Sequence, residues 1–230
     1  MRERRLMLQN KQQGGGIDEH TLLLLHLDGN TTDSSIYGRN IDYQYSFSYT
    51  TGKFGRCLYS NNIRGCIGYN NTFMSNILNS NQYTIELFAY FSTNYDWNHY
   101  VGCDDTSMSA FNLRFENTPQ YSRLCYGNYN NLTFSIPKAS SGLIQNQFNH
   151  IAVCKNKNNV YLFVNGNKIS QTKHKTIILP NAYFTIGGRQ NYGDGGSTGN
   201  IDTYNRVDEI RISDICRYTS DFTPPTKPFS

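Results

Sequence analysis

Several features are scarce in this sequence of 230 residues, and each scarcity excludes a class of protein. Charged residues make up only 17% of the chain while aromatic residues make up 14%, a balance that argues against intrinsic disorder. The longest aliphatic run, Leu22 to Leu25, is far shorter than the roughly 20 apolar residues that cross a bilayer. No segment resembles the apolar core of a signal peptide. We therefore expect a folded globular protein with neither membrane insertion nor classical secretion.

Paired carboxylates, which retaining glycosidases need about 5 Å apart, are also missing from the sequence pattern. None of the glutamates has an acidic partner two residues away, the spacing that would place both on one face of a strand. No G-x-S-x-G motif or phosphate-binding loop is present. The sequence therefore predicts a protein that is not an enzyme. The five glutamates are Glu3, Glu19, Glu86, Glu116 and Glu209.

Basic residues are concentrated at the N-terminus. The formal net charge is +4, and residues 1–16 account for +3 of it in a polar arm that ends in three glycines. The other residues carry only +1, so no basic face for binding nucleic acid is expected. The arm has the composition of a flexible tether that orders when it docks, although a disordered end without a role has the same composition. Its basic side chains are Arg2, Arg4, Arg5 and Lys11.

Cysteine is even in number but shows no pairing pattern. None of the six cysteines forms a C-x-x-C pair, and no histidine lies at a zinc-finger spacing from them. Several fall within predicted strands, where a free thiol acts as a small apolar side chain. The sequence favours reduced thiols. The cysteines are Cys57, Cys66, Cys103, Cys125, Cys154 and Cys216.

Alternation of apolar and polar residues is the dominant pattern from residue 20 to about 213, and it predicts strands with one buried face. The pattern is clear over Ile41–Tyr49, Tyr83–Phe91 and Phe111–Phe115. A β-hairpin is predicted over Val160–Thr172, because its Asn-Gly pair supplies the positive φ angles of a two-residue turn. One helical turn is expected at Asp214–Tyr218. These patterns predict a single β-sandwich domain over residues 17–230.

Five segments, in order along the chain, are similar to landmarks of laminin-G-like, concanavalin A-like domains. This resemblance implies an all-β fold, a two-sheet antiparallel jelly-roll sandwich preceded by the arm. Such folds serve both glucanases and proteins that only bind, so the resemblance does not choose a function. The landmarks lie at Leu22–Gly29 with Asp33–Ser35, Lys53–Tyr59, Tyr83–Phe88, Phe148–Gly166, and Phe184–Gly188 with Val207–Ser213.

A narrower resemblance covers Ile212–Pro225, which is similar to the ending of such domains in structural proteins of tailed bacteriophages. The Arg-rich start resembles virion proteins of crAss-like phages. These resemblances imply a head fibre, capsid decoration or tail-associated protein, made in the host cytoplasm and present as a homo-oligomer or in many copies on the virion. The arm would dock on capsid, portal or tail proteins. The alternative is an adhesion module that binds a host surface glycan.

Aromatic residues in polar, Asn-rich or Gly-rich surroundings are the candidate glycan-binding or partner-binding residues. Sugars are held by aromatic faces and by hydrogen bonds from polar side chains, which such segments provide. The opposing interpretation is that these residues are ordinary strand residues or cover an edge of the sandwich. The candidates are Tyr95, Trp97, Tyr100, Tyr126, Tyr129 and Tyr192.

A structural calcium ion is implied by the same family resemblance. Asp28, Asp33 and Asp208 match family positions, and the turn at residues 29–32 offers backbone carbonyls as further hard oxygen ligands. Asp28 and Asp33 are equally suited to turns and caps. Both interpretations are left open by the sequence.

Overall fold

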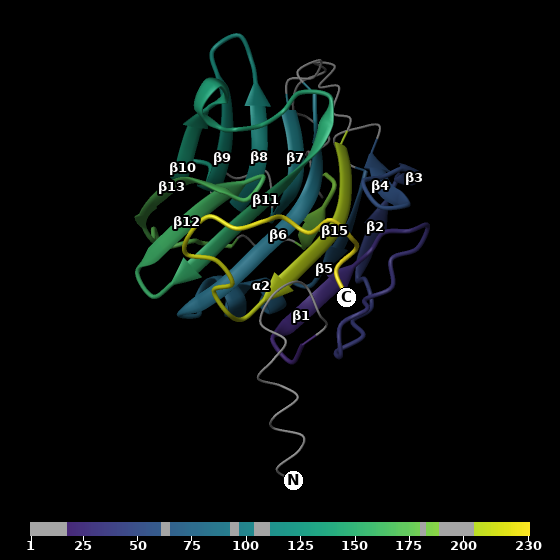
Figure 1. Cartoon of the computed structure of the whole chain (residues 1–230). Coiled ribbons are helices and arrows are strands. Elements are labelled where there is room, and N and C mark those ends of the chain that lie inside the picture. Colours follow the sequence, from purple (N-terminus) through teal and green to yellow (C-terminus); the bar gives the residue numbers. More distant parts are fainter. Residues whose placement is uncertain (1–17, 61–64, 93–96, 104–110, 180–182, 189–204) are drawn as a thin grey trace, which may run out of the picture.

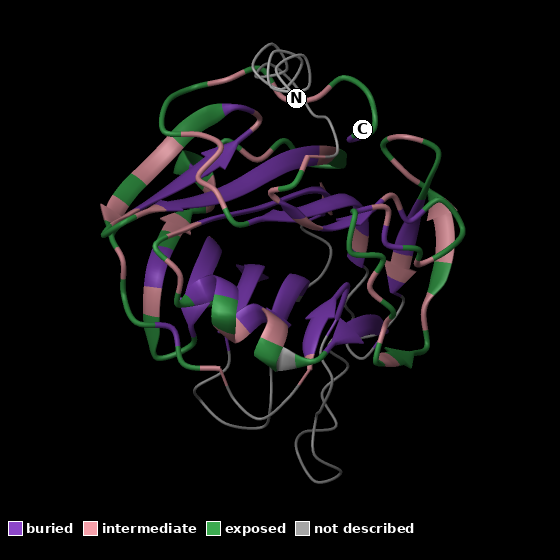
Figure 2. Cartoon of the chain, turned by 90° about the horizontal axis from the view of Figure 1, so that it is seen from below, coloured by how far each residue is buried: buried purple, intermediate pink, exposed green. Residues whose placement is uncertain are grey.

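Two antiparallel sheets packed face to face form the protein (Figures 1 and 2). The computed structural model describes residues 18–60, 65–92, 97–103, 111–179, 183–188 and 205–230. Sequence neighbours such as β11, β12 and β13 form a meander, whereas β6 lies beside β15 and β7 beside β14. These crossovers between distant strands confirm the predicted jelly-roll sandwich.

Sheet A is the eight-stranded sheet of the described residues. Its strands, from one edge to the other, are β13 (Asn167–Lys173), β12 (Asn159–Val164), β11 (Gln147–Asn156), β6 (Gln82–Phe91), β15 (Asn205–Ser213), β4 (Arg56–Ser60) and β3 (Ser48–Thr51), and β1 (Thr21–Leu25) also pairs with β15.

Sheet B has seven strands in the same described ranges. Their order is β10 (Asn131–Pro137), β9 (Ser122–Asn128), β8 (Phe111–Asn117), β7 (Trp97–Cys103), β14 (Phe184–Ile186), β5 (Cys66–Tyr69) and β2 (Tyr43–Tyr45).

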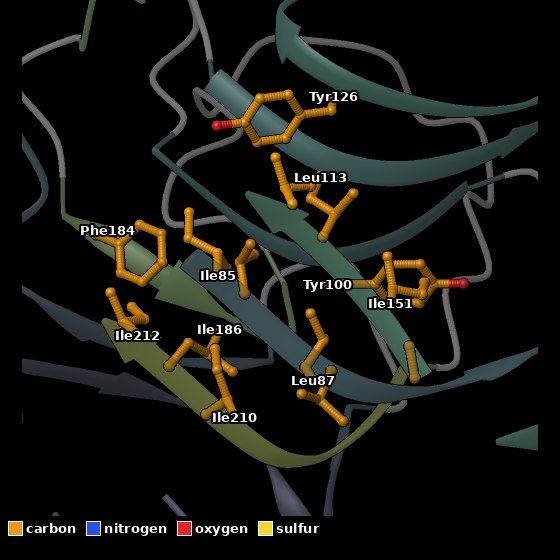
Figure 3. Packing of buried hydrophobic residues seen from close by; sticks show 14 of the residues in the cluster. Ile85, Leu87, Tyr100, Leu113, Tyr126, Ile151, Phe184, Ile186, Ile210 and Ile212 are labelled. Atoms are coloured by element: carbon orange, nitrogen blue, oxygen red, sulfur yellow. The ribbon is translucent and has the colours of Figure 1, made fainter. Parts of the chain in front are cut away.

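The hydrophobic core fills the space between the two sheets, and it follows the alternation read from the sequence. Ile85 and Leu87 of β6 point from sheet A toward Leu113 of β8 in sheet B (Figure 3). The odd-numbered positions of Tyr83–Phe91 and Phe111–Phe115 are fully or almost fully buried in this core, as predicted. Each buried Leu, Ile or Phe contributes about 1.5–3 kcal/mol, so the sandwich is held chiefly by these two inner faces.

One predicted strand is divided between the two sheets. The alternation over Ile41–Tyr49 continues without a break in the sequence, yet β2 pairs with β5 in sheet B and β3 pairs with β4 in sheet A. Ser46 lies between them with a positive φ of 39°, which turns the chain from one layer to the other. The expectation of one continuous strand was therefore wrong.

The helix prediction was also wrong. Residues 214–218 contain no helix, whereas α2 forms at Asn71–Leu78 and a short 3₁₀ helix, η1, at Lys138–Ser140. Asn70 caps α2 by accepting a hydrogen bond from the Thr72 backbone N–H at 2.9 Å. Eight residues are too few for a helical period to stand out in the sequence.

The hairpin of β12 and β13 confirms the prediction made from Asn165 and Gly166. Both turn residues have positive φ, 50° and 80°, as a type I′ turn requires. The Gly166 carbonyl accepts a hydrogen bond from Phe222 N at 2.9 Å. A Cβ on Gly166 would lie 2.0 Å from Phe222 O, so the turn and the C-terminal segment fit only with glycine here.

Residues 214–230, which we call the C-terminal strap, run across the outer face of sheet A (Figure 1). Phe222 stacks on Tyr218 with ring centroids 3.6 Å apart and meets the edge of Phe163 on β12. Near the end of the strap, Phe229 is 2% exposed and packs with Leu24 and Phe88. The strap therefore buries apolar side chains that alternation places outside the main core.

Candidate functional site

Charged and polar side chains occupy the outer face of β8 in sheet B. Because Phe111, Leu113 and Phe115 point into the core, Asn112, Arg114 and Glu116 lie on the opposite face. The side chain of Glu116 is 1% exposed, so its charge must be compensated by close partners.

Two arginines compensate Glu116. Arg114 Nε donates to Glu116 Oε1 at 2.9 Å, and Arg123 Nε on β9 donates to Oε2 at 2.6 Å. Arg123 is the register partner of Glu116, so strand pairing places the two side chains directly opposite each other. Burial disfavours the charged form of Arg123, but the Glu116 carboxylate outweighs it and the pKa of Arg123 is raised.

Two partly exposed tyrosines flank this Arg–Glu–Arg row. Arg123 lies 4.0 Å above the ring centroid of Tyr121, and Arg114 lies 4.8 Å from that of Tyr129. Tyr121 is 49% exposed and Tyr129 is 38% exposed. Tyr121 precedes β9 and Tyr129 follows it, so the two rings lie at opposite ends of a seven-residue strand.

We call Tyr121, Arg123 and Tyr129 the tyrosine platform. Arg123 also donates from Nη1 to the exposed Ser135 hydroxyl at 3.2 Å, and its side chain is 25% exposed. Aromatic rings held by guanidinium groups, beside a hydroxyl, can bind sugar C–H faces and sugar hydroxyls together. The length of the platform suits a chain of several sugars better than a single ring.

Two of the predicted binding tyrosines belong to the core instead. Tyr100 and Tyr126 are 0% exposed and point between the sheets (Figure 3). The Tyr126 hydroxyl forms a 2.6 Å hydrogen bond with that of Tyr83, and burial raises the pKa of Tyr126. Polar neighbours in the sequence suggested surface positions, but both rings face the core, Tyr100 at an irregularity in strand register between His99 and Val101, so neither can contact a glycan.

The other predicted aromatic residues have mixed outcomes. Tyr129 lies at the surface, and its role in binding stays a prediction. Trp97 begins β7 as the register partner of Glu116, while its side chain is outside the description. Tyr95 and Tyr192 lie outside the described residues, as do the arm residues Arg2, Arg4, Arg5 and Lys11.

Sequence reasoning missed Tyr121 and Arg123. A usable signal was present, because Arg114 lies in the predicted strand Phe111–Phe115 and Glu116 follows that strand directly, at the two-residue spacing that puts both on one strand face. The missing information was which strand supplies the opposite partner. That pairing of β8 with β9 depends on the sheet topology.

Among the predicted calcium ligands, Asp33 is used to shape a turn. Its Oδ1 accepts hydrogen bonds from the backbone N–H groups of Leu24 and Ser35, at 3.0 and 2.9 Å. Its Oδ2 accepts from the Ser35 hydroxyl at 2.9 Å and from Arg39 N at 2.7 Å. The turn interpretation therefore accounts for both oxygens of Asp33.

Asp28 and Asp208 both hold the turn at residues 53–56. Asp28 Oδ1 accepts from Arg56 N at 2.6 Å, while Asp208 Oδ2 accepts from Lys53 N at 2.7 Å and from Phe54 N at 3.0 Å. Burial, opposed by the hydrogen bond to Phe54, raises the pKa of Asp208 to about 7.

Only part of the predicted calcium site fits these carboxylates. Asp208 Oδ1 is buried without a hydrogen-bond partner, which leaves one hard oxygen for a cation. However, the described part of the chain contains no group of three or more His, Cys, Asp or Glu side chains that could hold a metal. The three aspartates therefore do not form one cluster of the described residues, and the calcium ion predicted at Asp28, Asp33 and Asp208 stays a prediction.

A cleft of about 430 Å³ lies on the opposite side of the sandwich, between sheet A and the strap. Its walls include Phe54, Phe88, Phe148 and the strap residues 223–226, with His150 among the lining residues. Several of the lining side chains are aromatic and contact one another. The ring centroid of Phe88 lies 4.9 Å from that of His150 and 5.2 Å from that of Phe54.

A family model described as the concanavalin A-like lectin/glucanases superfamily matches residues 68–217, which is more than half of the chain. The chain belongs to this superfamily. No curated protein sequence matches it at a significant level. No helix in the described part of this concanavalin A-like protein has the length and hydrophobicity to span a lipid bilayer.

Solved structures with the same fold include domain 4 of AbnA, an extracellular arabinanase from Geobacillus stearothermophilus, in complex with arabinotriose. It has a TM-score of 0.61 and 18% identity, over 86% of this chain and 93% of that one. The binding domain of Paraclostridial Mosquitocidal Protein 1 has a TM-score of 0.60 and 14% identity, over 86% and 49%.

The botulinum neurotoxin serotype D binding domain has a TM-score of 0.59 and 14% identity, over 87% of this chain and 49% of that one. This chain therefore spans about half the length of either toxin binding domain. At these identities the likeness shows the fold. The structures named here are not phage proteins, so they lend no support to the virion expectation.

Proposed function

We propose that this protein is a carbohydrate-binding adhesion module that recognises a surface oligosaccharide through the tyrosine platform. The observation that carries the proposal is the pair of partly exposed rings, Tyr121 and Tyr129, each held by an arginine of the buried Glu116 network. A pre-arranged aromatic surface binds with little loss of side-chain freedom, which favours recognition of a flexible glycan.

The proposal is one of binding without catalysis. Glu116 has both oxygens occupied by arginines, and Glu86 has both occupied by Arg211, His150 and Tyr218. Each carboxylate is at most 1% exposed. A glycosidase needs a carboxyl group free to donate a proton and a second one free to attack or to activate water. The network arrangement supports a structural use of these acids.

Glycan binding can be tested with the whole chain on an array of bacterial and host surface glycans. We expect binding to oligosaccharides of several sugars, and we expect Tyr121→Ala and Tyr129→Ala each to weaken it about tenfold, near 1.4 kcal/mol. Tyr45→Ala is the matched control, because Tyr45 is 48% exposed on β2, at the far edge of sheet B.

Two results would contradict the proposal. Wild-type protein that binds no glycan would remove the function, and equal binding by wild type and both platform variants would move the site elsewhere. Melting curves of all variants should lie close to that of the wild type, because the substituted rings are partly exposed and lie outside the core between the sheets.

The virion setting is a separate prediction about where such a module acts. It depends on the resemblance of Ile212–Pro225 to phage proteins and on the basic arm, residues 1–16, which lies outside the described residues. Mass spectrometry of purified particles tests it, together with incorporation of a chain that lacks residues 1–16. Loss of incorporation with retained glycan binding is the expected result, and absence of the wild-type chain from particles would exclude this setting.

A further inference from the structure

The start of the C-terminal strap lies directly over β11 at a pair of cysteines. Cys154 is on β11, opposite Thr84 of β6 in the strand register, and it is 0% exposed. Cys216 is the third residue of the strap and is partly exposed. It packs against the small apolar cluster that contains Cys154, Tyr161 and Phe163.

The Thr84 hydroxyl contacts Cys154 and both sequence neighbours of Cys216. It lies 3.5 Å from Cys154 Sγ, donates to the Ile215 carbonyl at 2.7 Å and accepts from Arg217 N at 2.9 Å. The residues on both sides of Cys216 are therefore anchored to the same hydroxyl that touches Cys154. This arrangement packs Cys216 against the cluster that contains Cys154 and places the two residues side by side.

The environment gives the two thiols different reactivity. The hydrogen bond from Cys154 lowers the pKa of Cys216, whereas burial raises the pKa of Cys154. Cys216 is thus the more acidic and the more accessible of the two. A thiolate is the attacking species in thiol–disulfide exchange, so Cys216 is suited to attack and Cys154 to resolve.

From this geometry we infer that Cys154 and Cys216 are a redox modification site, whose disulfide covalently clamps the strap to sheet A. The oxidant class is a small disulfide such as oxidised glutathione. The Cys216 thiolate attacks it to form a mixed disulfide and release one glutathione thiolate. Cys154 then loses its proton and attacks Cys216 Sγ, which releases the second glutathione. Two electrons pass to the oxidant, and the two cysteine protons end on the two glutathione molecules.

The clamp would act on a segment that already forms part of the cleft on sheet A. Strap residues 223–226 line that cleft, and Phe222 is anchored through Gly166. The disulfide would close a loop of about 60 residues, which restricts the unfolded chain and stabilises the folded one. Three of the four remaining cysteines are a natural internal reference, because burial raises the pKa of Cys57, Cys66 and Cys125 to about 12.

The test uses the full chain after treatment with reduced or oxidised glutathione. Each sample is denatured, alkylated with iodoacetamide and weighed as an intact protein, and the linked peptides are then mapped. We expect six alkyl groups on the reduced protein and four on the oxidised one, with Cys154 joined to Cys216. The oxidised protein should melt about 5–15 °C higher.

Cys216→Ser and Cys216→Ala are the informative variants, because this side chain is partly exposed and its replacement leaves the core intact. Both should fold and show no glutathione-dependent change in melting temperature. Six alkyl groups on oxidised wild type, or a linkage between other cysteines, would overturn the assignment. A Cys154–Cys216 link without a higher melting temperature would overturn the clamp.

Discussion

The outer faces of the two sheets use the same electrostatic element for different purposes. Each face carries a buried glutamate that lies between cationic partners, Glu86 on sheet A and Glu116 on sheet B. On sheet A the carboxylate also accepts a hydrogen bond from Tyr218 of the strap at 3.1 Å. On sheet B the arginines support two exposed tyrosine rings. A buried ion network thus anchors a covering segment on one face and supports the tyrosine rings of the proposed binding surface on the other.

The comparison shows that the surroundings of a buried acid decide its role. Burial opposes ionisation of Glu86, but Arg211 at 2.8 Å and the hydrogen bond from His150 outweigh it and lower the pKa to about 2. The strap then covers this charge with Tyr218, and Phe229 packs against Arg211 at 4.2 Å. Among the described residues of sheet B, Arg123 keeps a quarter of its side chain in solvent. That exposure makes it available to a ligand.

The largest effect is expected from Glu86→Gln, which removes the charge under the strap. Leaving Arg211 buried without its carboxylate should reduce the free energy of unfolding by about 3–5 kcal/mol, measured by urea denaturation at pH 7. Protease should also cut the strap faster, because the bond from Tyr218 is weakened. Glu19→Gln, at an exposed position, is the control.

The pH dependence of stability sharpens this prediction. The pKa of Glu86 is lowered from 4.5 to about 2, so its contribution to stability is complete above pH 4.5 and is lost as the pH falls toward 2. The wild type should therefore lose more stability than Glu86→Gln across this range. Parallel pH profiles would show that Glu86 is not held as an ion by the folded protein.

Gly166→Ala is expected to have the next largest effect on the free energy of unfolding, because it disrupts the contact between the strap and the hairpin turn. A Cβ would meet Phe222 O at 2.0 Å on a residue with φ of 80°, and we expect a loss of about 2–4 kcal/mol in unfolding free energy. Gly38→Ala separates the two causes, because Gly38 has a φ of 53° with nothing within 4 Å of the added atom.

Gly38→Ala should cost only about 1 kcal/mol, the part that comes from backbone strain. If the two glycine variants unfold at the same denaturant concentration, the close approach of strap and turn is not a source of stability.

Glu116→Gln tests the other face of the comparison. Loss of a charged acceptor for Arg114 and Arg123 should reduce the free energy of unfolding by about 2 kcal/mol. Glycan affinity should fall as well, because the guanidinium supports of Tyr121 and Tyr129 are loosened. Protease cleavage of the strap should stay at the wild-type rate. Faster strap cleavage in Glu116→Gln would show that the two faces are coupled.

The smallest effect on the free energy of unfolding is expected from substitutions in the core between the two sheets. Tyr126→Phe leaves the Tyr83 hydroxyl without its 2.6 Å partner and should cost about 1 kcal/mol, as should Tyr83→Phe. The double variant should be more stable than the sum of the two losses predicts, because no buried hydroxyl is then left unpaired. Urea denaturation of the four proteins measures this, and a change in glycan affinity would contradict the core position of Tyr126.

Prediction from the sequence succeeded where one local pattern decides one local structure. The Asn165-Gly166 turn and the buried alternation of Tyr83–Phe91 were both confirmed. It failed where the same local pattern is compatible with two different tertiary arrangements. Alternation over Ile41–Tyr49 does not reveal that the chain changes sheets at Ser46. Polar neighbours around Tyr100 and Tyr126 do not reveal that these rings turn inward.

The candidate site was predicted in part for the same reason. Tyr129 could be proposed from its local surroundings, since an Asn-rich turn at the end of a strand is usually exposed. The support given to Tyr121 and Tyr129 by the Glu116 network depends on the pairing of β8 with β9. Likewise, no spacing rule joins Cys154 to Cys216, because they meet only after the strap folds across sheet A.

Local chemistry in the chain thus decides the all-β class, the direction of most strand side chains and the hairpin turn, because these depend on neighbours one or two residues apart. The folded sandwich alone decides which acid meets which base, which tyrosines reach solvent and where the C-terminal strap lies. Those properties come from pairs far apart in sequence, such as Glu86 with Arg211 and Gly166 with Phe222. These pairs stabilise the protein only when both sheets and the strap are folded, because only then do the two partners of each pair lie in contact.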